Sequence, residues 1–156
     1  MGRRDRRSLV EQSAIPARIR TLFERGSRAI GMEYQPGVCN IGPAQQRRRL
    51  LLGVGSLLLA AVTVAVVLAM GWPRWTLIAS LFPLYGAAMG YFQYRERFCV
   101  GFAGIGVFDV GEGTQEVANA DALEADRRRA VRLNAKSLAV GAVGSLAIYG
   151  VSLVAL

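Results

Sequence analysis

Histidine is missing from this sequence of 156 residues, and lysine occurs once, at position 136. Without an imidazole, the chain lacks the side chain that most often acts as an acid or base near neutral pH. Ligation of haem or of a metal by histidine is excluded for the same reason. We therefore expect a protein that is not an enzyme, has no catalytic or metal-binding residues and holds no cofactor.

Charged side chains are absent from three long stretches, which run over residues 50–70, 75–94 and 138–156. Each is about 20 residues long, or about 30 Å as a helix, which is the hydrocarbon thickness of a bilayer. Three such helices in so short a soluble chain would leave too little polar sequence to cover them. The pattern predicts an all-α integral membrane protein with three transmembrane helices, in a membrane domain over residues 37–156.

Basic residues are distributed unevenly around these stretches. Residues 1–49 hold eleven arginines and four acids, residues 95–137 hold seven basic and seven acidic residues, and Arg74 alone lies between the first two spans. Because lysine and arginine are retained on the cytoplasmic side, the N-terminus and residues 95–137 are predicted to be cytoplasmic and the C-terminus external. The protein is thus expected in a cytoplasmic (inner) membrane, and we expect no nucleic-acid partner, since topology already accounts for the arginines.

The arm over residues 1–36 combines arginines with apolar residues at helical spacing. Ile15, Ile19, Leu22 and Phe23 fall on one face, and most of the arginines fall on the other. A basic amphipathic helix of this kind lies along an anionic inner leaflet. Docking of the same helix on the protein's own cytoplasmic segment is the alternative.

The first span is predicted to follow a turn-rich hinge over residues 34–42, with Asn40 or Gly42 as the cap and Pro43 in the first turn. Arginines on the cytoplasmic side of the first and third spans are expected to anchor lipid headgroups. These are Arg47, Arg48, Arg49, Arg127, Arg128 and Arg129.

The run Asn-Ile-Gly, then three arginines, then Leu-Leu-Leu-Gly-x-Gly covers residues 40–55. It resembles the start of the small YgaP-type inner-membrane domain family, in which an Asn-Val-Gly segment precedes an arginine and a glycine-bearing first span. The resemblance implies a small inner-membrane module and carries over no catalytic residue. The rest of the chain departs from that family's short two-span pattern.

The second span contains Gly86 and Gly90 at the spacing of a close-packing motif. We expect these glycines to pack against the first or third span of the same chain. A face for dimerisation is the alternative. Pro83 lies near the middle of this span and is expected to kink it.

An apolar, glycine-rich segment follows the second span, from Phe98 to Phe108. It is too short to cross a bilayer, and charged residues flank it on both sides, so both of its ends are predicted to lie at the cytoplasmic surface. Gly101, Gly104 and Gly106 allow tight turns or close contact with a neighbouring helix. We expect a packed juxtamembrane segment beneath the spans, with its phenylalanines buried. The glycine spacing matches neither nucleotide-binding fingerprint, so nucleotide binding is not expected.

The two cysteines, Cys39 and Cys99, are both predicted at the cytoplasmic ends of spans, and we expect them to approach each other. Their ordinary role is that of small buried residues. A possible thiol pair for redox or metal handling is the alternative, although two thiols without histidine do not complete a tetrahedral site within one chain.

These features together favour a small structural or accessory membrane protein. We expect its partners to be a bilayer with an anionic inner leaflet and either further copies of itself or a larger membrane complex. A thiol redox or metal-handling protein and a small transport subunit are the alternatives. Transport is disfavoured because no span carries a charged side chain, and ion or proton pathways usually need one.

Overall fold

The computed structural model describes residues 33–155, and one compact unit begins at Tyr34. This unit therefore starts slightly before the predicted boundary after residue 36. The predicted amphipathic helix of the arm lies outside the described residues.

The described part of the chain is mostly helical, as predicted. Two strands that pair antiparallel, with Val107 opposite Glu116, are the exception to the all-α prediction. The elements in chain order are α3 (Pro43–Ala69), the 3-10 helix η1 (Arg74–Ser80), α4 (Leu81–Arg95), α5 (Val100–Ile105), β1 (Val107–Phe108), β2 (Gln115–Glu116) and α6 (Ala120–Ala155). The hairpin forms because Gly106 ends α5 in a left-handed conformation and positive φ angles at Gly111 and Gly113 turn the chain back.

Two helices, α3 and α6, are long and apolar enough to cross a membrane. The region of the predicted second span is built differently, because the 3-10 helix η1 precedes α4 there. Pro83 is in the first turn of α4 and has no N–H to donate to the preceding turn. The sequence predicted a kink at Pro83, and the structure changes from a 3-10 helix to an α-helix just before this residue.

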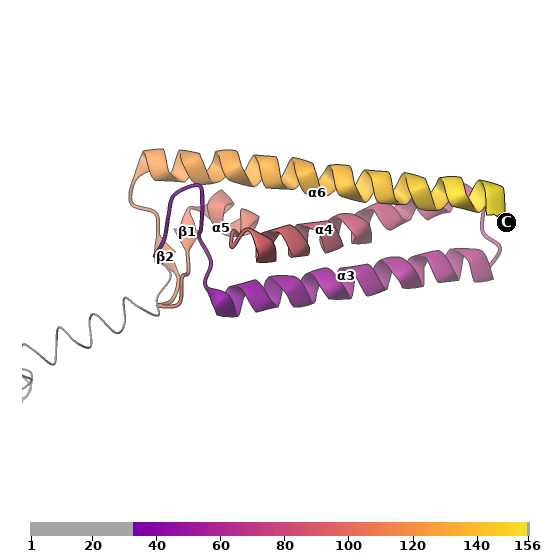
Figure 1. Ribbon diagram of the computed structural model, residues 1–156, viewed down its shortest axis with the longest axis horizontal. Coiled ribbons are helices and arrows are strands. Elements are labelled where there is room, and N and C mark those ends of the chain that lie inside the picture. Colours follow the sequence, from indigo (N-terminus) through magenta and orange to yellow (C-terminus); the bar gives the residue numbers. More distant parts are fainter. Residues whose placement is uncertain (1–32, 156) are drawn as a thin grey trace, which may run out of the picture. The chain divides into compact units, whose positions relative to one another are not determined.

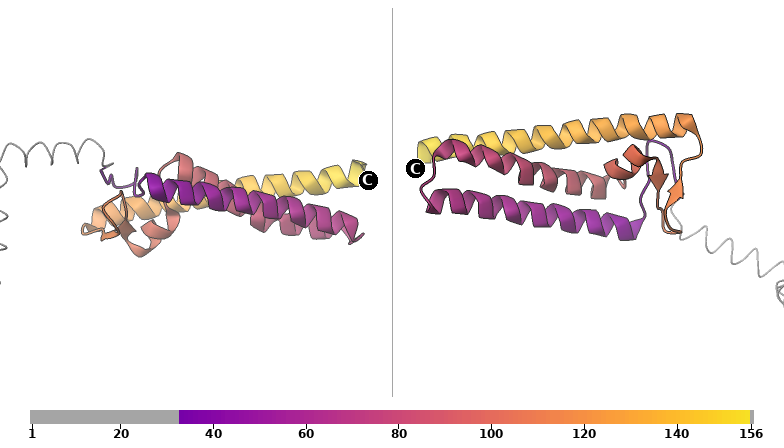
Figure 2. Two further views of the ribbon diagram at one scale, coloured as in Figure 1. Left: turned by 90° about the horizontal axis from the view of Figure 1, so that it is seen from below. Right: turned by 180° about the vertical axis from the view of Figure 1, so that it is seen from behind.

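The helices α3, α4 and α6 run side by side, with α4 packed against both of the others (Figure 1). The α4 helix runs in the direction opposite to its two neighbours, as the view from behind also shows (Figure 2). Residues 34–42, α5 and the β1–β2 hairpin gather where α4 ends and α6 begins. We call this group, with the first turns of α6, the loop end, and we call the opposite end, around residues 70–75, the turn end.

Small residues line the surfaces along which these helices touch. The buried residues of α3 are Gly53, Ala60 and Val67, which recur every seven residues and so lie on one side of the helix. The contact side of α6 includes Ala130, Ser137, Gly141 and Ser145. Side chains of this size allow two helix backbones to approach closely, which is the usual basis of helix packing in membranes.

Gly86 and Gly90 lie on the side of α4 that contacts α3. A Cβ atom placed on Gly90 would lie 2.5 Å from the Cα atom of Gly53, and one placed on Gly86 would lie 2.8 Å from the Ser56 hydroxyl. On the other neighbour, a Cβ atom on Gly141 of α6 would lie 2.9 Å from the backbone nitrogen of Tyr85. The two glycines of the predicted motif therefore pack against α3 of the same chain.

Candidate functional site

Asn40 joins the chain before α3 to the chain after α4. The Asn40 side chain is fully buried, its Nδ2 donates to the carbonyl oxygen of Cys99 at 3.0 Å and its Oδ1 accepts from the Cys99 amide at 2.6 Å. The backbone amides of Asn40 and Ile41 both donate to the carbonyl oxygen of Arg97. Arg97 has a φ of 52°, an uncommon conformation for a residue with a side chain. The loop end is thus held by satisfied backbone groups that water does not reach.

The two residues after Asn40 are buried as tightly. Ile41 is fully buried and forms a β-bridge with Asp109, and the Gly42 amide donates to the Asp109 carbonyl oxygen at 2.7 Å. A Cβ atom on Gly42 would lie 2.7 Å from the carbonyl group of Val110, so a side chain does not fit there. Gly42 is also the N-cap of α3, with Pro43 in the first turn. Each residue of the Asn-Ile-Gly run therefore has a defined contact.

Cys39 and Cys99 are both buried at the loop end, and both are free thiols. The sulfur of Cys99 accepts a hydrogen bond from the Phe102 amide at 3.4 Å and so caps α5. The thiol of Cys39 donates to the Ile41 carbonyl oxygen at 3.8 Å. The segments that carry the two cysteines do meet, but through the Asn40 side chain, and each sulfur has a separate partner. The predicted approach of the two thiols remains a prediction.

The glycine-rich segment packs on one face only. Phe98 is fully buried in a core with Ala103 of α5 and with Ala130 and Leu133 of α6, as predicted, whereas Phe102 and Phe108 are half-buried. Gly106 makes the expected tight turn. The close helix contact expected at Gly101 and Gly104 is not made with the described residues, because both lie on the exposed face of α5. Ala103 marks the side of α5 that faces this core.

Asp126 of α6 is a fully buried carboxylate that the sequence analysis did not single out. Its Oδ2 accepts from the Tyr34 hydroxyl at 3.0 Å and its Oδ1 accepts from the Gly37 amide at 2.6 Å. The Tyr34 ring also stacks on Phe108, with ring centres 4.2 Å apart. Burial, followed by the hydrogen bond and the charge of Asp126, raises the pKa of Tyr34 above its usual value. Asp126 thus fastens the beginning of the described chain to α6.

The predicted anchor arginines fall into two groups. Arg129 is only one-third exposed and forms an ion pair of 2.7 Å with Glu96, which also binds Lys136 at 3.2 Å. Arg129 is therefore joined to the end of α4, and its role as a lipid anchor remains a prediction. Arg49 is half-buried, with its guanidinium 5.8 Å from the ring centre of Phe102. The others, Arg47, Arg48, Arg127 and Arg128, are exposed.

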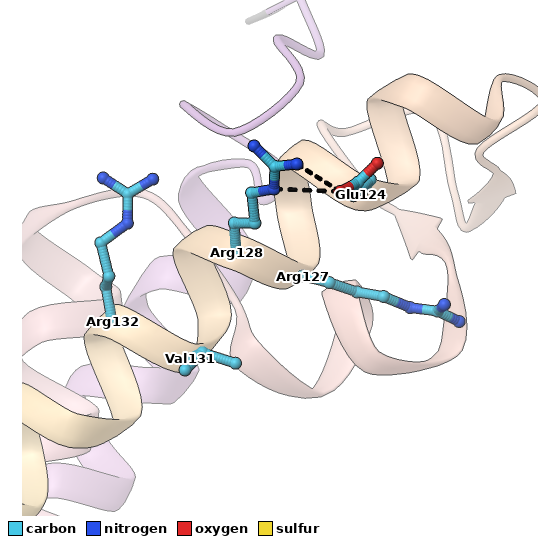
Figure 3. A pocket seen from close by; sticks show the side chains of 5 residues that line it. All are labelled: Glu124, Arg127, Arg128, Val131 and Arg132. Atoms are coloured by element: carbon cyan, nitrogen blue, oxygen red, sulfur yellow. Dashed lines mark hydrogen bonds and ion pairs between the residues drawn. The ribbon is translucent and has the colours of Figure 1, made fainter.

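A shallow, open hollow lies on α6 near its first residues (Figure 3). Val131 contributes an exposed apolar surface, and Arg128 forms an ion pair with Glu124, one helical turn away. We call this surface the basic hollow, and its lining residues are Glu124, Arg127, Arg128, Val131 and Arg132. The spacing of Glu124 and Arg128, four residues apart, is typical of an ion pair along one helix, but nothing in the sequence singled out Val131 as part of a surface.

Groups of three or more histidine, cysteine, aspartate or glutamate side chains that would hold a metal are absent from residues 33–155. Comparison of the chain with protein-family models, with curated proteins and with solved structures finds no match. The resemblance of residues 40–55 to the YgaP-type family therefore remains a prediction.

Proposed function

We propose that this chain is a three-span integral membrane protein with a structural or accessory role, and that it packs with itself or with a larger complex of the cytoplasmic membrane. The observation that carries the membrane location is the outer surface of α3 and α6. Leu51 is 70% exposed, Leu58 64%, Val143 68% and Val154 91%. Soluble monomers rarely expose large continuous apolar patches, whereas hydrocarbon is a favourable neighbour for such a surface.

The third span of the proposal is η1 followed by α4. Together they extend about 36 Å, which exceeds the hydrocarbon thickness of about 30 Å. Trp75, Ile78 and Phe82 are exposed on this segment. Trp72 and Trp75 lie at the turn end and Tyr91 and Tyr94 near the loop end, which agrees with the aromatic belts at the two surfaces of a membrane.

The charges support an orientation with the loop end in the cytoplasm. Exposed Arg47 and Arg48 precede the apolar part of α3, and Arg95 and Lys136 lie near the same level on α4 and α6. At the turn end Arg74 is the single basic residue, and its Nη1 donates to the Ser152 carbonyl oxygen at 2.6 Å, near the last turn of α6. Because arginine and lysine are retained inside, the loop end is the cytoplasmic end in this proposal.

A structural role is supported by how the polar groups of the loop end are used. The buried side chains of Asn40 and Asp126 hold loops in place, and Glu96 joins α4 to α6 through Arg129 and Lys136. Each of these three side chains bonds to another part of the chain, which is the use of polar groups expected of a structural role.

Two fractionation measurements test the proposal. In membranes from cells that express the chain, it should stay in the pellet after alkaline carbonate washing and enter solution only with detergent. In mild detergent its protein mass, measured by light scattering with the bound detergent subtracted, should then exceed the monomer mass of 16.8 kDa. Release by carbonate would contradict the membrane location, and a lone monomer at every protein concentration would contradict the role in an assembly.

A further inference from the structure

The first turns of α6 extend well beyond the bilayer if the proposed membrane topology holds, and the inference below rests on that topology. The helix has 36 residues, and its charge-free part begins after Lys136. Arg132 lies about 8 Å and Arg127 about 15 Å along the helix from Ser137. The headgroup region of one leaflet is about 5–8 Å thick. The basic hollow therefore stands mostly in the aqueous phase, above the phosphates that lipids would offer.

The surface of the basic hollow is almost entirely apolar, and the arginines that line it carry guanidinium charge that is not fully neutralised within the described residues. Arg128 is paired with Glu124, whereas Arg127 and Arg132 are exposed and make no ion pair or side-chain hydrogen bond with residues 33–155. Figure 3 shows these two side chains on opposite sides of the Glu124–Arg128 pair. Together with the exposed Val131, they form a surface suited to a partner that has carboxylates at the same height above the membrane.

Carboxylates of that kind are present on the β1–β2 hairpin of the same protein. Glu112 lies in the turn and Glu116 in β2, both are exposed, and neither forms an ion pair within the described part of the chain. The hairpin lies level with the first turns of α6, since a Cβ atom on Gly106 would lie 3.3 Å from the Leu123 side chain. Copies inserted with the same orientation therefore present two unpaired carboxylates level with the first turns of α6, near the height of Arg127 and farther from the membrane than Arg132.

We infer that the basic hollow of one copy binds the Glu112–Glu116 hairpin of a second copy, so that the chain associates with itself through its cytoplasmic end. Charge complementarity selects this occupant, and a membrane raises the encounter rate by fixing the orientation of both copies. Because these charges are exposed to solvent, added salt weakens the association.

Charge exchange tests this inference. Full-length chains that carry donor and acceptor fluorescent proteins at the N-terminus are expressed together, and energy transfer is measured in inside-out membrane vesicles at low and high salt. The double variant R127E/R132E should weaken dimerisation by about tenfold, because it places like charges opposite one another. The double variant E112R/E116R should weaken it as much, and co-expression of the two double variants should restore transfer between them. Chains with R3E/R4E, the same change of charge at positions far along the sequence from every predicted span, serve as the control and should behave as the parent.

Three outcomes would overturn the inference. Equal loss in the R3E/R4E control would indicate general electrostatics, and failure of the two double variants to restore transfer would exclude the proposed pairing. Transfer that depends on added phosphatidylglycerol and not on the hairpin would assign the hollow to anionic lipid. In each case, retention of the chain after carbonate washing shows that the membrane proposal itself still stands.

Discussion

The helices of this protein touch through small side chains, whereas its loop end is held by buried polar groups. Along α3, α4 and α6 the contacts involve Gly53, Gly90 and Gly141, and the side chains on the outer surfaces are apolar. At the loop end, Asn40 and Asp126 are fully buried and hydrogen-bonded. Within hydrocarbon, burial of apolar surface drives no association between helices, so helices there associate mainly through close van der Waals contact. In water the loops need satisfied backbone groups instead.

The largest expected effect is on the helix contacts. Gly90→Leu should lower the free energy of unfolding by about 3 kcal/mol, because a side chain there overlaps the backbone of α3 at Gly53. Gly55→Leu is the matched control, since a Cβ atom at Gly55 meets no described atom within 4 Å. Thermal unfolding in detergent, followed by circular dichroism, compares the two variants. Equal stability of the two would show that close backbone contact does not hold the helices together.

A smaller effect is expected at the loop end. Asn40→Ala leaves the amide and the carbonyl group of Cys99 without their buried partner, which costs about 2 kcal/mol. The loss should appear as faster hydrogen exchange at Cys99, measured by mass spectrometry on peptides from the loop end. Exposed Gln35 lies in the same segment, and Gln35→Ala should leave exchange unchanged. Slow exchange at Cys99 in the Asn40 variant would show that the Asn40 side chain does not hold this segment in place.

Alkaline pH should have the smallest effect. The pKa of Tyr34 is higher in the folded than in the unfolded chain, so the folded state keeps its proton longer. The stability that this proton contributes is complete below the unfolded pKa of about 10 and is lost as the pH rises toward the folded pKa. The free energy of unfolding should therefore fall by at most about 1 kcal/mol per pH unit above pH 10. Tyr34→Phe should remove this contribution and exposed Tyr94→Phe should not; identical pH profiles for both would exclude Tyr34 as its source.

The sequence predicts the helical part of this protein better than the loop end. Charge-free stretches mark α3 and the later part of α6, and the spacing of Gly86 and Gly90 marks a helix contact, because both features are local to one helix. The pairing of Asn40 with Cys99 joins residues far apart in the chain, and no local pattern announces it. The burial of Asp126 could not be predicted for another reason. Its neighbours in the sequence are arginines, and a segment of this composition is usually an exposed, charged surface.

The surroundings of two expected sites depend on geometry that the sequence does not show. Gly101 and Gly104 allow tight turns or close helix contact, and in the structure both lie on the exposed face of α5. Arg129 has the sequence context of a lipid anchor, but its position on α6 brings it within 2.7 Å of Glu96 at the end of α4. Which face of a helix is covered depends on the elements that pack against it, and the periodicity of one sequence does not show which elements these are.

The number of membrane crossings is the central claim, because α3 and α6 alone would make two spans and η1 with α4 adds the third. Alkaline phosphatase fused after Gly71, after Thr114 and after Leu156 reports the side of each position, since the enzyme is active only outside the cytoplasm. Three spans predict activity after Gly71 and Leu156 and none after Thr114. Activity after Thr114 together with inactivity after Leu156, in stably expressed fusions, would show two spans and would contradict the account.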